Sequence, residues 1–309
     1  MLDIHQLNVF LVAAQTLNFT RAAQRLQMTQ PSVSQHIQSL EKHFDDQLFY
    51  RSGRNIELTE AGQALMPLAR EAVTLSTRIE ETMASQKGEI SGHLLVGCST
   101  TPGKYVLPPL LAQFHSKHPQ VRLTCQVIGQ SQALQQLCEG EIHFTLTSLP
   151  EPSCPGLEIQ PYLTDDLELI VPADHPWACR EEIEFSELVE TQFLMREPGS
   201  GTYEILHAQL TQVGIAIESL DVLLTLGNSE AIVLAVKEGL GAAFVSRIVV
   251  EKLGQESVAA VPVAGLNLER EIFFARNAQR PATAAQNAFW EYILHKHQTA
   301  LPPVKTFAD

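Results

Sequence analysis

A row of short amide and hydroxyl side chains is the first feature of this chain with the means to do chemistry. It consists of Gln30, Ser32, Ser34, Gln35 and Gln38. The row faces outward if the neighbouring apolar residues form the buried stripe of a helix, at Val33, Ile37, Leu40 and Phe44. Side chains that both donate and accept hydrogen bonds suit the base edges of a DNA major groove, so the row is predicted to line or approach that groove. Thr29 and Pro31, at the start of the same helix, are predicted to bind DNA with it. An ordinary solvated helix surface is the alternative interpretation.

Two short helices joined by a tight connection must hold this row, within the run from Asn18 to Leu40. A threonine oxygen accepts hydrogen bonds from the free N–H groups of a first turn, so Thr20 is predicted to cap the first helix and Thr29 the second. Pro31 falls in the first turn of the second helix, where its missing N–H costs little. A preceding helix over about 4–17 would close a three-helix core.

Two arginines flank a turn just beyond these helices. Ser52-Gly53 separates two extended segments, which predicts a small β-wing with Arg51 and Arg54 on or beside its turn. Arginines in that place would bind phosphates, which fix position and affinity without reading sequence. Solvated surface charges are the competing interpretation.

A long helix is predicted from a cap at Thr59 to about residue 87. Apolar residues follow a heptad spacing along it, at Leu65, Leu68, Ala72, Leu75 and Ile79. A seam on a helix without a neighbouring helix in sequence favours a homodimer, and packing against the chain's own core is the alternative. Pro67 is predicted to bend the helix or loosen its first turns.

Beyond Gly92 strands and helices alternate, which predicts a parallel sheet flanked by helices, in two α/β lobes with a ligand cleft between them. Ser99, Thr100 and Thr101 fall between a predicted strand and a helix, where free N–H groups favour negative charge. Lys104 and Arg196 are near enough in sequence to such loops to add positive charge. The cleft is therefore predicted to take a small anion, and surface positions at loop edges are the alternative.

The length and net charge of the chain limit the number of domains and the partners that can be expected. The chain has 309 residues, 45% of them hydrophobic, so two or three domains with real cores are expected. A net charge of −14 argues at first sight against a nucleic-acid partner. Residues 1–60 hold five lysines and arginines against six acids, however, so this segment carries only −1 and the remainder −13. The N-terminal segment can therefore still present its arginines to DNA.

The compartment is predicted from the start of the chain and from its cysteines. No apolar run approaches a membrane span, and the first residues lack a secretory signal. The five cysteines show no C-x-x-C spacing, so we expect reduced, structural thiols in the cytoplasm, with a redox-sensing pair as the alternative. No membrane partner, metal or cofactor is predicted.

An enzyme is the competing class of function. Ser, His and Asp are present, but there is no G-x-S-x-G elbow, H-E-x-x-H or P-loop, and no G-x-G-x-x-G after a strand. The spacings of His115 with His118, and of His295 with His297, do not favour a metal site. A solute-binding protein is the second alternative, and the N-terminal helices argue against it.

The first 60 residues carry a long ordered pattern. It includes Leu7, Phe10, Phe19-Thr20-Arg21-Ala22-Ala23, Leu26, Gln30-Pro31-Ser32-Val33-Ser34, Ile37, Leu40-Glu41, Leu48-Phe49, Arg51 and Leu58-Thr59-Glu60-Ala61-Gly62. This pattern resembles that of the LysR-type transcriptional regulators. The resemblance extends over the whole chain, through STTPGKYVLPPLL, REPGSGT and NSEAIVLAVKEGLGAAFV.

The resemblance implies an architecture and an assembly. It implies a winged helix-turn-helix over 1–60, a linker and dimerisation helix over 61–91, and a two-lobed α/β effector domain over 92–309, similar to type 2 periplasmic binding proteins. Lobe 1 would comprise about 92–163 and 268–309, and lobe 2 about 164–267. A homotetramer is the implied assembly, with double-stranded promoter DNA and a small anionic effector as partners.

The same resemblance adds effector residues and reveals two departures. If the lobe arrangement of the family holds, the cleft also receives Ser131, Thr147, Ser200, Gly201 and Thr202. Asp45 stands where the family commonly has glycine after the second short helix, so that turn is expected to differ slightly. His143 stands where the family usually has an aspartate, which puts local contacts in the first lobe in question.

Overall fold

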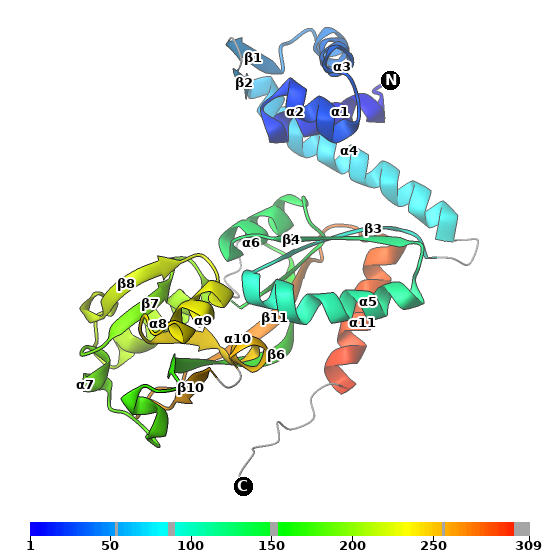
Figure 1. Ribbon diagram of the computed structural model, residues 1–309. Helices are drawn as coiled ribbons and strands as arrows, with labels where there is room; N and C mark the ends of the chain where they lie inside the picture. Colours follow the sequence, from blue (N-terminus) through cyan, green and yellow to red (C-terminus); the bar gives the residue numbers. More distant parts are fainter. Residues whose placement is uncertain (53–54, 86–89, 149–153, 255–256, 300–309) are drawn as a thin grey trace. The chain divides into compact units, whose positions relative to one another are not determined.

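The computed structural model describes residues 1–52, 55–85, 90–148, 154–254 and 257–299 (Figure 1). Its contacts divide the chain into two compact units, Met1–Ile90 and Ser91–Asp309. In the part of the chain that is described, no helix is both long and apolar enough to cross a membrane.

The first unit is a three-helix core with a hairpin and a long helix. Its elements are α1 (Ile4–Thr16), α2 (Phe19–Leu26), α3 (Gln30–Phe44), β1 (Phe49–Ser52), β2 (Asn55–Leu58) and α4 (Glu60–Ser85). Strands β1 and β2 pair antiparallel, from Phe49 opposite Leu58 to Ser52 opposite Asn55. Phe10, Ile37 and Leu40 are fully buried between the helices. The predicted helix-turn-helix and wing are therefore confirmed.

The caps of these helices correct one prediction and confirm two. Asn18, not Thr20, caps α2, because its amide oxygen accepts from the N–H groups of both Thr20 and Arg21. Thr29 caps α3 by accepting from the N–H of Ser32, at 3.3 Å. The Thr59 hydroxyl accepts from the N–H of Gly62 at 3.0 Å and so caps α4.

The apolar faces of α3 and α4 also differ from the predicted stripes. Phe44 is exposed, because it is the last residue of α3 and lies past the edge of the core. On α4, Leu65 and Ala72 pack partly against the core of their own unit. The other predicted seam residues, Leu68, Leu75 and Ile79, are exposed. Pro67 lies within a helix that continues to Ser85.

The second unit is a two-lobed α/β fold built on a mixed sheet. Its strands are β3 (Gly92–Cys98), β4 (Val121–Val127), β5 (Phe144–Thr147), β6 (Leu157–Pro172), β7 (Gln192–Arg196), β8 (Asp221–Leu226), β9 (Ala243–Ser246), β10 (Val258–Val261) and β11 (Glu269–Asn277). Its α-helices are α5 (Leu107–Lys117), α6 (Gln130–Glu139), α7 (Phe185–Leu188), α8 (Gly201–Gln212), α9 (Ser229–Lys237), α10 (Arg247–Leu253) and α11 (Ala284–Thr299). Three single turns complete it: η1 (Pro102–Val106), η2 (Pro176–Cys179) and η3 (Ile217–Ser219).

The sheet is not purely parallel, which corrects the prediction. Strand β3 runs parallel to β4 and β5, and β7 runs parallel to β8. Strand β6, however, pairs antiparallel with β11 along its first part and with β9 and β10 along its second. Strands β6 and β11, green and orange in Figure 1, run between the lobes, and the chain passes along them in opposite directions. Helix α10 and strand β10 were not predicted.

Two local features of the second unit bear on earlier expectations. Cys138 and Cys154 form a disulfide with their Cα atoms 5.8 Å apart, so the prediction that all thiols are reduced is wrong. Cys138 lies near the end of α6 and Cys154 shortly before β6, with β5 between them in the chain. His143 is half-buried, and its Nδ1 accepts from the N–H of Leu95 at 3.1 Å. It therefore provides an acceptor, as the aspartate it replaces would.

Candidate functional site

Helix α3 displays the predicted polar row on its surface. Gln35 and Gln38 are exposed, while Ser32 and Ser34 are half-buried. Near the start of the helix the Gln30 Nε2 donates to the Ser34 hydroxyl at 3.0 Å, which holds the amide over the first turn. Thr29 and Pro31 are exposed beside it. The row therefore offers donors and acceptors to a partner, as base reading requires.

The predicted phosphate contacts lie partly outside the described structure. Arg51 belongs to β1, but its side chain is not described, and Arg54 lies outside the described residues altogether. Two further arginines of the first unit, Arg21 and Arg25 on α2, are exposed.

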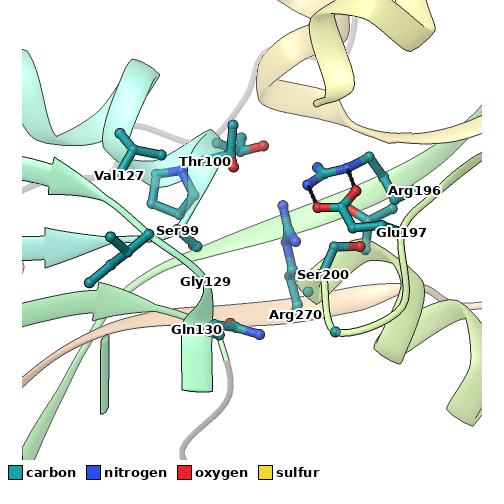
Figure 2. A pocket seen from close by; sticks show the side chains of 15 residues that line it. Ser99, Thr100, Val127, Gly129, Gln130, Arg196, Glu197, Ser200 and Arg270 are labelled. Carbon is teal, nitrogen blue, oxygen red and sulfur yellow. Dashed lines mark hydrogen bonds and ion pairs between the residues drawn. The ribbon is translucent and has the colours of Figure 1, made fainter. Parts of the chain in front are cut away.

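A pocket of about 200 Å³ opens in the second unit where several loops meet (Figure 2). Seven of the predicted effector residues line it: Ser99, Thr100, Thr101, Arg196, Ser200, Gly201 and Thr202. They come from the segment between β3 and η1, from the end of β7 and from the start of α8. Its volume is below the roughly 300–1,000 Å³ typical of drug-sized ligands, so it suits a small metabolite.

Three predicted residues do not reach the pocket lining. The Lys104 ammonium binds the Glu230 carboxylate at 3.0 Å instead. Ser131 is exposed on the surface of α6, one residue past the helix start. Thr147 is fully buried behind the lining, where its hydroxyl donates to the Gln130 Oε1 at 2.7 Å.

Arg270 lies in the middle of the pocket view in Figure 2 and was missed by the sequence reasoning. Its Nε and Nη2 donate to Asp165 Oδ2 at 2.8 and 2.6 Å, and both residues are buried. The Ser246 hydroxyl donates to the other Asp165 oxygen at 2.8 Å. A buried charge requires such a partner. This pairing holds the guanidinium in one orientation and leaves Nη1 without a hydrogen-bond partner among the described residues.

Gln130, at the first turn of α6, is a second donor that the sequence reasoning missed. Its Oε1 accepts from the Thr147 hydroxyl and from both the N–H and the hydroxyl of Ser148, at 2.7–2.9 Å. Because a backbone N–H can only donate, the amide must point its oxygen toward Ser148 and its Nε2 away. This Nε2 is buried and has no hydrogen-bond partner among the described residues. A buried donor of this kind calls for an acceptor from outside the protein.

Arg196 is less available than Arg270 for binding an anion in the pocket. Its Nε and Nη2 bind both Glu197 oxygens at 2.8 Å, and its Nη1 donates to the Ser229 hydroxyl at 3.1 Å. The hydrogen bonds from Arg196 hold the pKa of Glu197 below its usual range. The dashed lines in Figure 2 mark this carboxylate–guanidinium pair at the edge of the pocket. A bound anion would have to share Arg196 with Glu197.

Helix starts and a glycine complete the donor set. Gly129 directly precedes α6 and has no side chain to cap it, so the N–H groups of the first turn of the helix are open to a ligand. Gly201 begins α8, and a Cβ there would lie 2.6 Å from the Ser148 Oγ, 3.3 Å from Arg270 Nη1 and 3.5 Å from Gln130 Nε2. The glycine therefore keeps open the space that these donors share.

Some of the missed residues had a signal in the sequence. In the strand EREIFFARN, Arg270 alternates with Glu269 and Glu271 and so lies on the opposite, buried face, where a charge requires a partner. Gln130 had none, because an amide at a helix start is an ordinary surface residue until tertiary contacts fix its orientation. Glu197 and the apolar Val127 and Ile128 also line the pocket and were not predicted.

Comparison with known proteins places the chain in a family. A model described as "Bacterial regulatory helix-turn-helix protein, lysR family" matches residues 4–63, and one described as "LysR substrate binding domain" matches residues 87–298. The chain belongs to the LysR family of transcriptional regulators. A probable RuBisCO transcriptional regulator of Synechocystis sp. is 31% identical over 99% of this chain and 90% of its own length. Membership in this family places the chain among regulators rather than enzymes.

Solved structures of other LysR regulators share the fold. Full-length CbnR, solved in complex with its target DNA, covers 96% of this chain and 100% of its own, with a TM-score of 0.65 and 22% identity. The regulatory domain of Synechocystis CcmR, solved in complex with 2-PG, covers 68% of this LysR chain and 99% of its own, with a TM-score of 0.62 and 26% identity.

Proposed function

We propose that this LysR regulator binds promoter DNA through α3 and the wing, and that a small anion bound in the pocket controls it. In this proposal the chain has a DNA-binding domain over 1–60, a linker over 61–91 and an effector domain over 92–309. It works as a homodimer through Leu68, Leu75 and Ile79 of α4, assembled further into a homotetramer, in the cytoplasm. A ligand acts by binding one arrangement of the lobes more tightly than the other.

The observation that carries the anionic effector is the set of donors without an acceptor. Gln130 Nε2 is buried and unpaired within the described residues, and the space next to it also adjoins Arg270 Nη1. Around them lie the uncapped start of α6 and the hydroxyls of Ser99 and Thr100. Every such group donates, so carboxylate or phosphoryl oxygens complement them. Because Asp165 and Glu197 already offset both arginines, we expect a small ligand of low charge rather than a polyanion.

A pair of glycine variants tests this assignment. Gly201→Ala adds a methyl group into the space beside Arg270 Nη1, whereas Gly129→Ala adds one at a pocket position with no atom within 4 Å. We expect Gly201→Ala to weaken binding of inorganic phosphate by about tenfold, the effect of one charge-assisted hydrogen bond of about 1.5 kcal/mol. Gly129→Ala should bind nearly as the parent does. Isothermal titration calorimetry measures both, and equal affinities in the two variants would contradict the site.

The DNA-reading role rests on the outward amides of α3, and Gln35 is the sharpest test. Replacing an amide that reads a base costs about 1–3 kcal/mol and relaxes sequence preference at that base. Gln35→Ala should therefore lose affinity and selectivity for DNA upstream of the gene, measured by gel shift and footprinting. Gln63→Ala, an exposed amide on α4, is the matched control. Undiminished affinity and an unchanged footprint for Gln35→Ala would remove Gln35 from the interface.

Salt dependence separates the two kinds of contact. Phosphate contacts release counterions, so binding of the parent should fall steeply with salt. Gln35→Ala should keep the same salt slope, because an amide releases no counterion. A dimer also predicts two half-sites spaced by about one helical turn of DNA or a multiple.

A further inference from the structure

Two cysteines lie side by side next to the pocket. Cys98 ends β3 and Cys125 lies on the neighbouring strand β4, and their Sγ atoms are 3.2 Å apart. A disulfide bond is about 2.05 Å long, so these sulfur atoms would have to approach by only about 1 Å. Both are free thiols in this structure, in contrast to Cys138 and Cys154.

The two thiols differ in access and in chemistry. Cys98 is fully buried and Cys125 is exposed. The hydrogen bond between them raises the pKa of Cys98 and lowers the pKa of Cys125. An accessible thiol with a lowered pKa beside a second thiol has the features of a redox-sensing cysteine with its resolving partner.

The pair is joined to the pocket at both strands. Cys98 directly precedes Ser99, and Val127, two residues after Cys125, also lines the pocket. The Cys98 sulfur is packed against Gly103, where an added Cβ would lie only 2.4 Å from it. Gly103 in turn donates its N–H to the Ser99 carbonyl at 2.9 Å. A displacement of the Cys98 sulfur is therefore transmitted directly to residues 99–103.

We propose that Cys125 and Cys98 form a peroxide-sensitive dithiol switch that reshapes the Ser99–Thr101 side of the pocket. The Cys125 thiolate attacks a hydroperoxide, ROOH, which gives the sulfenic acid Cys125–SOH and releases the alkoxide, protonated to ROH. The Cys98 thiol then attacks the Cys125 sulfur and displaces water, which leaves a Cys98–Cys125 disulfide. A dithiol reductant restores both thiols and is itself oxidised to a disulfide.

The experiment uses the full chain, treated with hydrogen peroxide and then with an alkylating agent. Peptide mapping by mass spectrometry should show a Cys98–Cys125 cross-link, with loss of about 2 Da for the two hydrogens removed. Cys179, exposed and free, is the control thiol within the same molecule. Oxidation at Cys125 should be about tenfold faster than at Cys179 because it depends on the thiolate. In Cys98→Ala, Cys125 should instead accumulate as the sulfenic acid and be captured by dimedone.

The coupling to the pocket needs a readout that does not depend on any effector. Hydrogen exchange of the backbone N–H groups of Ser99, Thr100, Thr101 and Gly103 should change several-fold between the thiol and disulfide forms, and should not change in peroxide-treated Cys125→Ser. Equal oxidation of Cys125 and Cys179, or the same dimedone capture with and without Cys98, would overturn the switch. A cross-link without any change at 99–103 would overturn its link to the pocket. Failure of phosphate to bind would contradict the proposed effector and leave these outcomes readable.

Discussion

The surface of α3 and the pocket of the second unit show two ways of building a site. Every residue of the polar row on α3 comes from one helix, between Gln30 and Gln38. The pocket gathers residues from four separated segments, 99–102, 127–130, 196–202 and Arg270. A single helix fixes the directions of its own side chains by its 3.6-residue period. A pocket made of several segments depends on strand order, on partners far away in sequence and on buried charges.

This difference explains what the sequence could predict. The helices, the hairpin and the outward row of the first unit follow from local spacing, and the errors there concern one cap and the end of α3. Asn18 replaces Thr20 because both are good cap residues and only the path of the chain decides between them. The end of α3 left Phe44 exposed because a helical pattern does not say where the core stops.

In the second unit the sequence predicted which segments line the pocket better than it predicted the partner of each side chain. Residues directly after a strand or before a helix, such as Thr100 and Ser200, reached the pocket as predicted. Residues whose role depends on a distant partner were missed or misplaced. Lys104 forms an ion pair with Glu230 instead of reaching the pocket. Arg270 is held in place by hydrogen bonds to Asp165, 105 positions away in sequence. The Cys138–Cys154 disulfide likewise could not be predicted from the spacing of the cysteines.

Breaking the buried pair gives the largest effect that we expect. Arg270→Met leaves the Asp165 carboxylate buried with only the Ser246 hydroxyl, and loss of one partner of such a pair costs about 3–5 kcal/mol. Urea unfolding should show this loss in the second unit. Arg21→Met, on the exposed surface of α2, should change stability by less than about 0.5 kcal/mol. The double variant Asp165→Leu/Arg270→Met should recover much of the loss. No recovery would mean that Asp165 is not the cause.

His143 allows a milder test of the same long-range dependence. Burial first, and then the nearby His93, lower the pKa of His143 to about 4, against 6.5 for an ordinary histidine. The folded protein therefore binds fewer protons than the unfolded chain between these values. Stability from this group is present above pH 6.5 and is lost as the pH falls toward 4, by about 3 kcal/mol in total.

The control for this pH dependence keeps the hydrogen bond and removes the titration. In His143→Gln the amide oxygen can still accept from the N–H of Leu95. His93, whose pKa is also lowered by burial and by Arg122, remains in both proteins and cancels in the difference. Urea unfolding at pH 7, 5.5 and 4.5 should therefore show a steeper loss in the parent. Parallel curves would mean that His143 is protonated in the folded state.

The smallest effect that we expect is in the first unit, where Asp45 occupies a helix C-terminal position that favours glycine. Asp45 ends α3 in the left-handed conformation, with φ 54°, and its N–H donates to the Glu41 carbonyl. Glycine adopts this conformation without a Cβ penalty, and a carboxylate at a helix C-terminus is opposed by the helix dipole. Asp45→Gly should therefore stabilise the first unit, by about 0.5–1 kcal/mol after allowing for the greater freedom of the unfolded chain. Asp45→Ala removes the charge but keeps a Cβ at this φ, so it should gain less or lose stability. If alanine stabilised as much as glycine in thermal unfolding, charge rather than backbone conformation would govern this turn, and the Gly→Asp departure from the family pattern would be an electrostatic change alone.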